Sequence, residues 1–311
     1  MSPVNKAQLQ IHFCVVLWGF TAILGKLITL QALALVWWRV LLVTIVLLLV
    51  PKVWRGLRAM SWRLIAAYAG IGVLVSLHWL TFYGAIKLAN ASVGVTCMAL
   101  GTVFLALIEP WIARRRFDPR ELLLGIAVVP GVAMVVGGVP AEMRLGIAVG
   151  VLSAFLVAVF SSFNKRLVEH GDPLTVTCIE LGAGTIFLSL IAPLLPHTGA
   201  MFPLPDSHDA ILLLLLAMGC TLLPFALSLV ALRHLSAFSS QLAINLEPVY
   251  AIVLAVLLLG EQRELDILFY AGVAIILGAV LLYPLLSRRS EPLAQPELLG
   301  TAEAKGVAEV G

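Results

Sequence analysis

Charged residues are scarce in this chain, and their scarcity argues against a soluble fold. Asp, Glu, Lys and Arg make up 12% of the 311 residues, while hydrophobic residues make up 61%. Soluble domains carry about 25% charged and about 45–50% apolar residues. The longest connection between apolar stretches, residues 195–209, has about fifteen residues, which is too short for a soluble domain. The net charge of +3 is too small to indicate a nucleic-acid partner.

Cysteine is scarce as well. The four cysteines fall in four different apolar stretches and form no Cys-X-X-Cys pair. This distribution argues against a disulfide framework or a cysteine-ligated metal. We expect all four to be small buried hydrophobic side chains, namely Cys14, Cys97, Cys178 and Cys220.

Catalytic and metal-binding patterns are also missing. The chain has no His-Glu-X-X-His site and no phosphate-binding glycine loop. Ligand-type residues gather in one connection, but their spacing matches no metal signature; they are His197, Asp206, His208 and Asp209. Asp206 or Ser207 is more simply the N-cap of the helix that follows. We therefore predict no catalytic residues, no metal and no cofactor.

Long apolar stretches, in contrast, fill most of the chain. A hydrocarbon core of about 30 Å needs roughly 20 apolar helical residues to cross it. The sequence predicts an all-α integral membrane protein with ten transmembrane helices, at residues 11–30, 32–51, 64–88, 91–112, 120–139, 145–168, 173–196, 208–232, 236–259 and 266–286. The first stretch is longer than the apolar region of a typical signal peptide, so we interpret it as an uncleaved first helix.

The distribution of positive charge predicts the orientation. If the N-terminus is cytoplasmic, 15 of the 20 Lys and Arg residues fall on the cytoplasmic side, four on the other side, and Arg39 within a span. Positive residues are enriched in cytoplasmic loops. We therefore expect a multi-pass protein with both termini in the cytoplasm. The polar residues 287–311 are expected to form a disordered cytoplasmic tail.

The second half of the chain repeats the first. Residues 87–91 (Lys-Leu-Ala-Asn-Ala) correspond to residues 233–237 (Arg-His-Leu-Ser-Ala) at an offset of 146. Each repeat holds five spans, at residues 1–140 and 141–286, and because five is odd the second repeat enters the membrane from the opposite side. Inverted repeats are the architecture of many secondary transporters, whose substrate site lies near the midplane between the halves.

The motifs of the second half resemble a known family. Residues 237–250, followed by Leu259-Gly260-Glu261, are similar to the EamA-type branch of the drug/metabolite transporter superfamily. Trp18-Gly19 and Arg39 match the same family in the first half. The closest resemblance is to YddG-like exporters of aromatic amino acids in bacterial inner membranes. It implies ten helices and the export of amino acids or related metabolites.

The first half departs from the family pattern in two places. Thr102 stands where the family usually has proline, and Arg114-Arg115 replace a Gly-Glu pair. These departures weaken the resemblance of the first half but leave the predicted architecture unchanged.

Few ionisable residues lie inside the apolar stretches. A charge at the bilayer centre costs about 2.5–3.5 kcal/mol on insertion scales, so each of these residues is expected to have a structural or functional role. Arg39 and Glu180 lie about 10 Å in from opposite membrane faces, at 1.5 Å per residue. They are therefore not expected to be direct partners. Each is either a gate charge or substrate anchor at its own mouth, or a side chain that snorkels or bonds to a helix end.

Glu247 lies close to the midplane of the ninth span. Pro248 beside it removes a backbone donor and breaks the helix, and Asn245 adds a second polar group. Asn245 and Glu247 lie on different helical faces, of which only one can look straight into a central cavity. The sequence does not decide which of the two faces lines the cavity. A structural role for this break and contact with a ligand are equally good interpretations.

Aromatic and polar stripes on other spans predict a mostly neutral, aromatic pocket. Packing of the same side chains, or an interfacial aromatic belt, is the alternative interpretation. The predicted substrate-binding residues are Trp18, His78, Trp79, Tyr83, Phe160, Asn164, Phe225, Asn245 and Glu247.

Together these features favour a secondary transporter that exports neutral or aromatic amino acids, or related small metabolites, by alternating access. Its expected partners are a small-molecule substrate and membrane lipid, with no nucleic acid, and it is expected to be a monomer or weak dimer in the bacterial inner membrane. One alternative is an intramembrane lipid-processing enzyme with a Ser/His dyad built on His78. Others are an exporter of a different metabolite or drug class, and a channel.

Overall fold

The computed structural model describes residues 2–195, 199–244, 246–260 and 266–287. His197, Asn245, Arg263 and residues 288–311 of the expected tail lie outside this part of the chain. The described residues form helices joined by short connections, and no strand occurs among them. The all-helical prediction is confirmed for these residues.

The first half contains seven α-helices and one short 3₁₀ turn. They are α1 (Pro3–Leu27), α2 (Ala32–Leu48), α3 (Pro51–Ala59), α4 (Trp62–Leu88), α5 (Ala91–Cys97), η1 (Met98–Leu100), α6 (Gly101–Ile112) and α7 (Pro119–Gly137).

The second half contains seven further α-helices, two 3₁₀ turns and a π-helical segment. They are η2 (Ala141–Met143), α8 (Arg144–Leu167), α9 (Pro173–Ile191), η3 (Ala192–Leu194), α10 (Ser207–Leu214), the π-helix η4 (Leu215–Leu222), α11 (Leu223–Leu232), α12 (Ala237–Ile244), α13 (Glu247–Leu259) and α14 (Ile267–Ser287).

Seven of these helical stretches in the described residues are long and apolar enough to cross a membrane. An eighth is obtained if α2 and α3, which meet at a bend of 89°, are counted as one broken span. The second span was predicted to continue to residue 51, and a separate helix α3 was not predicted. Pro51 starts a new helix at this bend because proline is well tolerated in the first helical turn.

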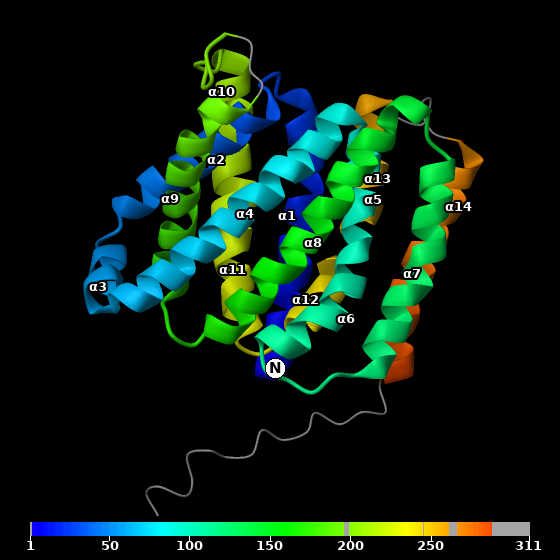
Figure 1. Cartoon of the computed structure of the whole chain (residues 1–311), viewed down its shortest axis with the longest axis horizontal. Coiled ribbons are helices and arrows are strands. Elements are labelled where there is room, and N and C mark those ends of the chain that lie inside the picture. The colour runs from blue at the N-terminus through cyan, green and yellow to red at the C-terminus, as the bar shows by residue number, and fades with distance from the viewer. Residues whose placement is uncertain (1, 196–198, 245, 261–265, 288–311) are drawn as a thin grey trace, which may run out of the picture.

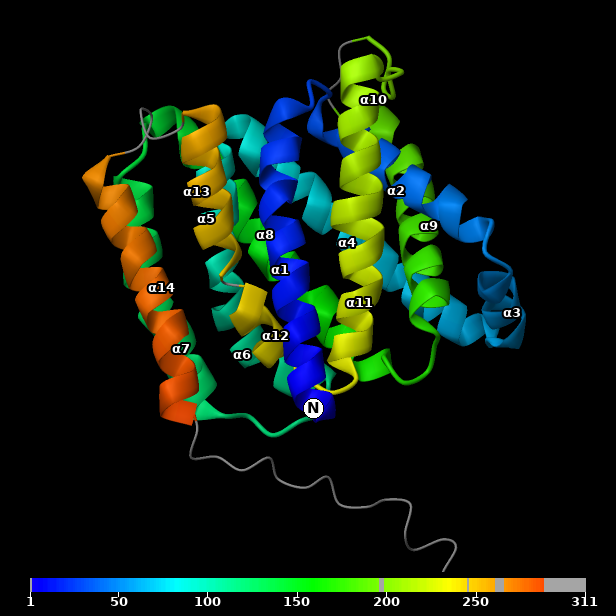
Figure 2. The same ribbon diagram turned by 180° about the vertical axis from the view of Figure 1, so that it is seen from behind.

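The helices stand roughly side by side in one bundle (Figures 1 and 2). The start of α1 and the end of α14 lie at the same end of the bundle, which we call the terminal end, and α10 begins at the other, the far end. At one edge α7 and α14 pack together. A Cβ on Gly131 would lie 2.6 Å from the carbonyl oxygen of Gly272, so this crossing requires small residues.

The outer surface of the bundle is strongly apolar. Large hydrophobic side chains are 62–74% exposed on three different helices, as in Leu123, Ile186, Leu190, Leu257 and Leu258. Soluble monomers rarely expose large contiguous apolar patches. These side chains are suited to contact lipid, and the chain is a multi-pass membrane protein.

Corresponding contacts recur in the two halves at the offset found in the sequence. Lys87 donates to the carbonyl of Ile28 at 2.5 Å, and Arg233, 146 residues later, donates to the carbonyl of Gly171 at 2.9 Å. The N-caps follow the same register: Asn90 caps α5, and Ser236 accepts from the amide of Ser239 at the start of α12.

Several local predictions are confirmed. The four cysteines are buried and free. Asp206 is the N-cap of α10 and accepts from the amide of Asp209 at 2.8 Å.

Two contacts tie the halves together at the far end. The carboxylate of Asp209 accepts from the backbone amide of Thr29 at 3.0 Å and from its hydroxyl at 2.7 Å. His208 lies 3.5 Å from the same carboxylate. Ligand-type atoms of Asp206, His208 and Asp209 lie within 4.8 Å of one another, but Asp206 and Asp209 already use their oxygens to cap α10 and to hold Thr29.

Candidate functional site

A cavity of about 110 Å³ lies inside the bundle, several times the space that one water molecule needs. Its wall is built by residues of α1, α2, η1, α4, α8, α11, α12 and α13. The lining residues are Ile11, Trp18, Thr21, Arg39, His78, Trp79, Phe82, Met98, Val157, Phe160, Ser161, Asn164, Phe225, Ser228, Leu229, Leu232, Ala237, Ser240, Gln241, Ile244 and Glu247.

Eight of the residues singled out in the sequence line this one cavity: Trp18, Arg39, His78, Trp79, Phe160, Asn164, Phe225 and Glu247. Two of the others, Tyr83 and Glu180, do not line it. Asn245 is outside the described residues. The predicted stripes on separate spans therefore meet in space.

The aromatic part of the wall is formed by rings in mutual contact. Trp79 and Phe225 meet edge to face with centroids 5.8 Å apart. The ring of His78 lies 5.4 Å from that of Phe160 and 6.2 Å from that of Phe82. Apolar and aromatic walls with a few polar groups are typical of small-molecule sites.

Arg39 is completely buried and is held by the side chains around it. Its guanidinium carbon lies 4.0 Å from the centroid of Trp79, a favourable cation–π geometry. Its Nε donates to the hydroxyl of Thr221 at 2.6 Å and one terminal nitrogen donates to the hydroxyl of Tyr83 at 2.9 Å. The other terminal nitrogen donates to the carbonyl of Cys220 at 3.4 Å.

The π-helical segment of the eighth span explains how Thr221 and Cys220 reach Arg39. Thr221 donates its hydroxyl to the carbonyl of Leu216, five residues earlier, at 2.6 Å. Pro224 follows the segment and has no amide hydrogen to continue the helical ladder. The role of Thr221 could not be predicted from the sequence, because its partner, Arg39, is 182 residues away.

Tyr83 was predicted to contact substrate, but the structure places it beside Arg39 rather than in the cavity wall. It is fully buried, and its hydroxyl accepts from Arg39. Its ring also fills the space next to Gly25, where a Cβ would lie 2.3 Å from the ring. Tyr83 therefore helps to fix the guanidinium and packs α4 against α1.

Glu247 is the first residue of α13, directly after the break in the ninth span. Anionic groups are stabilised at helix N-termini by the helix dipole. Ser240, Gln241 and Ile244 line the cavity together with Glu247, so residues from both faces of this span contribute to the wall. No described residue donates a hydrogen bond to the Glu247 carboxylate.

His78 is paired with Ser153, and the pairing favours one tautomer of the ring. Its Nδ1 lies 3.0 Å from the carbonyl oxygen of Ser153, and a carbonyl only accepts, so Nδ1 carries the hydrogen and Nε2 is an acceptor. The Ser153 hydroxyl donates to the carbonyl of His78 at 2.8 Å. The Ser153 hydroxyl oxygen also lies 2.9 Å from Nδ1. With the hydrogen on Nδ1, the hydroxyl cannot donate its proton to that atom, as a serine nucleophile would have to do.

Glu180 lies behind the cavity wall rather than in it. The amide nitrogen of Asn164, a wall residue, lies 3.4 Å from one Glu180 oxygen. The other Glu180 oxygen and the Asn164 carbonyl oxygen are buried without a hydrogen-bond partner. Arg39 donates its hydrogen bonds to Thr221, Tyr83 and Cys220, in line with the expectation that Arg39 and Glu180 are not direct partners.

Two hydroxyl groups in the wall were not among the residues selected from the sequence. Thr21 and Ser240 line the cavity, and their buried side-chain oxygens have no hydrogen-bond partner among the described residues. Thr21 lies three residues after Trp18, and Ser240 lies seven before Glu247, so both share a helical face with a selected residue. That spacing is the signal that could have found them.

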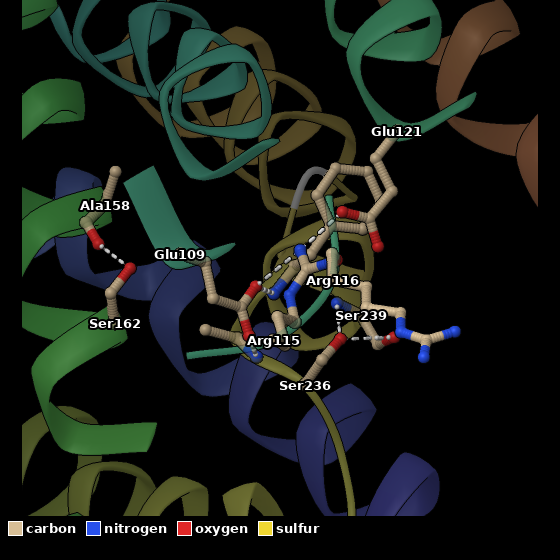
Figure 3. Close-up of polar contacts among 10 residues, drawn as sticks. Glu109, Arg115, Arg116, Glu121, Ala158, Ser162, Ser236 and Ser239 are labelled. Carbon is tan, nitrogen blue, oxygen red and sulfur yellow. Dashed lines mark hydrogen bonds and ion pairs between the residues drawn. The ribbon is translucent and has the colours of Figure 1, made fainter. Parts of the chain in front are cut away.

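A charged cluster joins the two halves at the terminal end of the bundle (Figure 3). The fully buried carboxylate of Glu109, on α6, accepts from the backbone amides of Ala237 and Phe238 at 2.8 and 2.7 Å. Arg115 lies 3.1 Å from the same carboxylate and also contacts Glu121, the third residue of α7. We call Glu109, Arg115 and Glu121 the Glu109 cluster.

The Glu109 cluster positions one end of the cavity wall, because Ala237, whose amide it binds, also lines the cavity. Burial lowers the pKa of Arg115, but Glu109 and Glu121 more than offset this and raise it overall, so the guanidinium stays charged. The sequence analysis noted Arg115 only as a departure from a family pattern. It could not detect the cluster because Glu109 and Ala237 are 128 residues apart.

Comparison with known proteins gives one family and a few distant relatives. The pattern of the EamA-like transporter family matches the chain twice, at residues 5–137 and 144–291. The chain is 24% identical over 221 residues to an uncharacterized transporter of Clostridium kluyveri, covering 68% of this chain and 69% of that protein.

It is also 27% identical over 169 residues to a probable terminal-alkyne amino-acid exporter of Streptantibioticus cattleyicolor, covering 53% of this chain and 54% of that protein. A solved structure, described only as the crystal structure of a protein, superimposes with a TM-score of 0.66 at 17% identity. That match covers 93% of this chain and 99% of the other, and it shows that the two share a fold.

Proposed function

The chain belongs to the EamA-like transporter family, and on that premise we propose that it exports neutral or aromatic amino acids, or closely related small metabolites, across a bacterial inner membrane. The single observation that carries this proposal is the cavity. It combines an aromatic wall with one buried cation, Arg39, and one carboxylate, Glu247. A free amino acid carries the matching groups: an anion, a cation and a side chain.

We further propose that the chain crosses the membrane ten times as two inverted five-helix repeats, residues 1–140 and 141–286. The family pattern matches each half once, and α7 and α14 are the fifth and tenth spans of this arrangement. Contacts that recur at the 146-residue offset, such as those of Lys87 and Arg233, support the same view.

In this proposal the terminal end of the bundle faces the cytoplasm. Connections at that end carry many cations, including Lys52, Arg55, Arg58, Arg114, Arg116 and Arg233, as expected of cytoplasmic loops. The halves rock around the cavity to give alternating access. Ties between the halves exist at both ends: Glu109 to α12 at the terminal end and Asp209 to Thr29 at the far end.

The alternatives have less support. The Ser153 hydroxyl donates to the backbone carbonyl of His78 rather than to its ring, which argues against the Ser/His enzyme. Exporters of another metabolite class remain the competing hypothesis, and the probable amino-acid exporter among the relatives favours amino acids. The proposed partners are substrate and lipid, and a single chain, which contains both repeats, is sufficient for the cycle.

The test is counterflow in proteoliposomes. Vesicles containing the purified protein are preloaded with unlabelled phenylalanine or threonine and diluted into the labelled amino acid without any ion gradient. Transient accumulation of label is the expected result, because a carrier exchanges substrate and a simple pore does not. Absence of accumulation for both amino acids, also with an imposed pH gradient, would overturn the amino-acid assignment.

A further inference from the structure

We propose that Arg39 and Glu247 form a two-point site for a zwitterion, in which Arg39 binds the substrate's α-carboxylate and Glu247 binds its α-ammonium group. The inference rests on the proposed function, because it assigns roles within the same cavity. The inference also states how the cavity selects its substrate. Both charges of the amino acid are required for binding, and the aromatic wall contacts the substrate's side chain.

The first step is the hydrogen-bond capacity of Arg39. A guanidinium has five N–H donors, and the contacts to Thr221, Tyr83 and Cys220 use one on each of its three nitrogens. One N–H therefore remains on each terminal nitrogen. Two parallel donors of this kind match the two oxygens of a carboxylate.

The second step is that Arg39 is fixed before any ligand arrives. The guanidinium carbon lies 4.0 Å from the centroid of the Trp79 ring. The nitrogens of the guanidinium donate hydrogen bonds to two hydroxyl groups and a carbonyl. A pre-organised arginine loses little conformational entropy on binding. Tyr83 and Thr221 are positioning residues in this account, because they act on substrate through Arg39.

The third step concerns Glu247 and His78. Glu247 lines the cavity and accepts no hydrogen bond from the described residues. The Nε2 atom of His78 has no hydrogen, since Nδ1 donates to Ser153. An ammonium group offers three donors, so it can satisfy the carboxylate and leave hydrogens for His78 or for the unpartnered hydroxyl of Ser240.

The fourth step is the separation of the two charges. Arg39 and Glu247 line one cavity, yet in the described residues no carboxylate lies within 4.0 Å of the Arg39 guanidinium. A buried charge without a counter-ion is strongly unfavourable. A ligand that carries both charges on adjacent groups compensates both residues at once, whereas a ligand with one charge leaves the other residue uncompensated.

The experiment is competition for phenylalanine binding to the purified protein in detergent. Phenethylamine lacks the carboxylate and 3-phenylpropionate lacks the ammonium group, while both keep the aromatic ring. With the wild-type protein, each analogue should bind about 10- to 100-fold more weakly than phenylalanine, the value of one hydrogen-bonded charge.

Two neutral variants assign the charges. Arg39→Gln should weaken phenylalanine binding by about 10- to 100-fold and leave phenethylamine binding near its wild-type value. Glu247→Gln should weaken phenylalanine and spare 3-phenylpropionate. Arg39→Lys and Glu247→Asp keep the charges and should recover part of the affinity. The matched controls are Arg144→Gln and Glu142→Gln, which neutralise exposed residues outside the cavity.

The outcomes separate the two proposals. If wild-type protein binds phenylalanine but the single-charge analogues compete equally well, or if both neutral variants bind phenylalanine like the wild type, the zwitterion site is wrong and the transporter proposal stands. If the wild type binds no amino acid and transports another metabolite, the substrate class is wrong. Thermal unfolding of each variant, compared with the controls, shows whether a loss of binding reflects loss of folding.

Discussion

Buried charges are arranged differently in the Glu109 cluster and in the cavity. In the Glu109 cluster, carboxylates and a guanidinium are in direct contact, and two backbone amides bind the Glu109 carboxylate. In the cavity, Arg39 and Glu247 share a wall without an ion pair. Charges in contact hold helices of the two halves together, whereas separated charges are available to a ligand. This contrast separates a structural ion-pair network from the proposed binding site in the same chain.

The largest effect is expected from removing the anion of the Glu109 cluster. Glu109→Ala leaves the amides of Ala237 and Phe238 and the guanidinium of Arg115 without their shared acceptor. Breaking a buried ion pair by removing one partner costs about 3–5 kcal/mol. We expect a clear drop in the thermal unfolding temperature in detergent.

The conservative change Glu109→Gln keeps one oxygen acceptor and should restore part of the stability, while Glu142→Gln serves as the exposed control. If Glu109→Ala unfolds at the wild-type temperature, the Glu109 cluster does not hold α12 in place. That result would contradict the structural role assigned to the cluster.

A large but selective effect is expected from the aromatic wall. Phe225→Ala removes the ring that packs against Trp79, so the affinity for phenylalanine should fall about 10- to 100-fold, as for lost apolar contact in a pocket. The affinity for alanine should change little, because its side chain does not reach the ring. Competition binding with phenylalanine and with alanine measures the loss of affinity for each. An equal loss for both amino acids would contradict the assignment of the aromatic wall to the substrate's side chain.

A smaller effect is expected from a positioning residue. Tyr83→Phe removes one hydrogen bond to Arg39 and leaves the packing of the ring against Gly25 intact. A net loss of about 1 kcal/mol corresponds to roughly a 5-fold weaker affinity for phenylalanine. Phenethylamine binding should not change, since it does not use Arg39. A change that is the same for both ligands would assign Tyr83 to packing alone.

The smallest effect is expected at the outer part of the cluster. Glu121→Gln removes one of two carboxylates from Arg115, which keeps Glu109. We expect a loss of about 1 kcal/mol or less in the free energy of unfolding and wild-type affinity for phenylalanine. Denaturation and binding measured on the same preparation check both parts. A loss as large as that of Glu109→Ala would mean that Arg115, rather than the amides of α12, carries the stabilisation.

Much of the fold follows from local features of the sequence. Apolar length predicts the long helices, Asp206 predicts the start of α10, and Pro248 predicts the break in the ninth span, where α12 ends at Ile244 and α13 begins at Glu247. The bend between α2 and α3 was not predicted, because a hydropathy pattern does not distinguish a span from a span that turns at Pro51.

The site was predicted in composition but not in arrangement. Stripes on single helices gave Trp18, His78, Phe160 and Phe225, and the structure brings them to one cavity. The partners of Arg39 and Glu109 were missed, since they depend on which helices become neighbours. Thr221 and Ala237 are more than 120 residues away from the side chains they meet, and no periodicity within one helix encodes that proximity.

The most direct test of the account is counterflow of labelled phenylalanine into proteoliposomes that contain either the wild-type protein or Arg39→Gln, with Arg144→Gln as the control. The account predicts transient accumulation by the wild type and the control, and accumulation by Arg39→Gln only at phenylalanine concentrations raised about 10- to 100-fold. Accumulation by Arg39→Gln at the wild-type concentration would contradict the claim that the buried cation of the cavity binds the substrate.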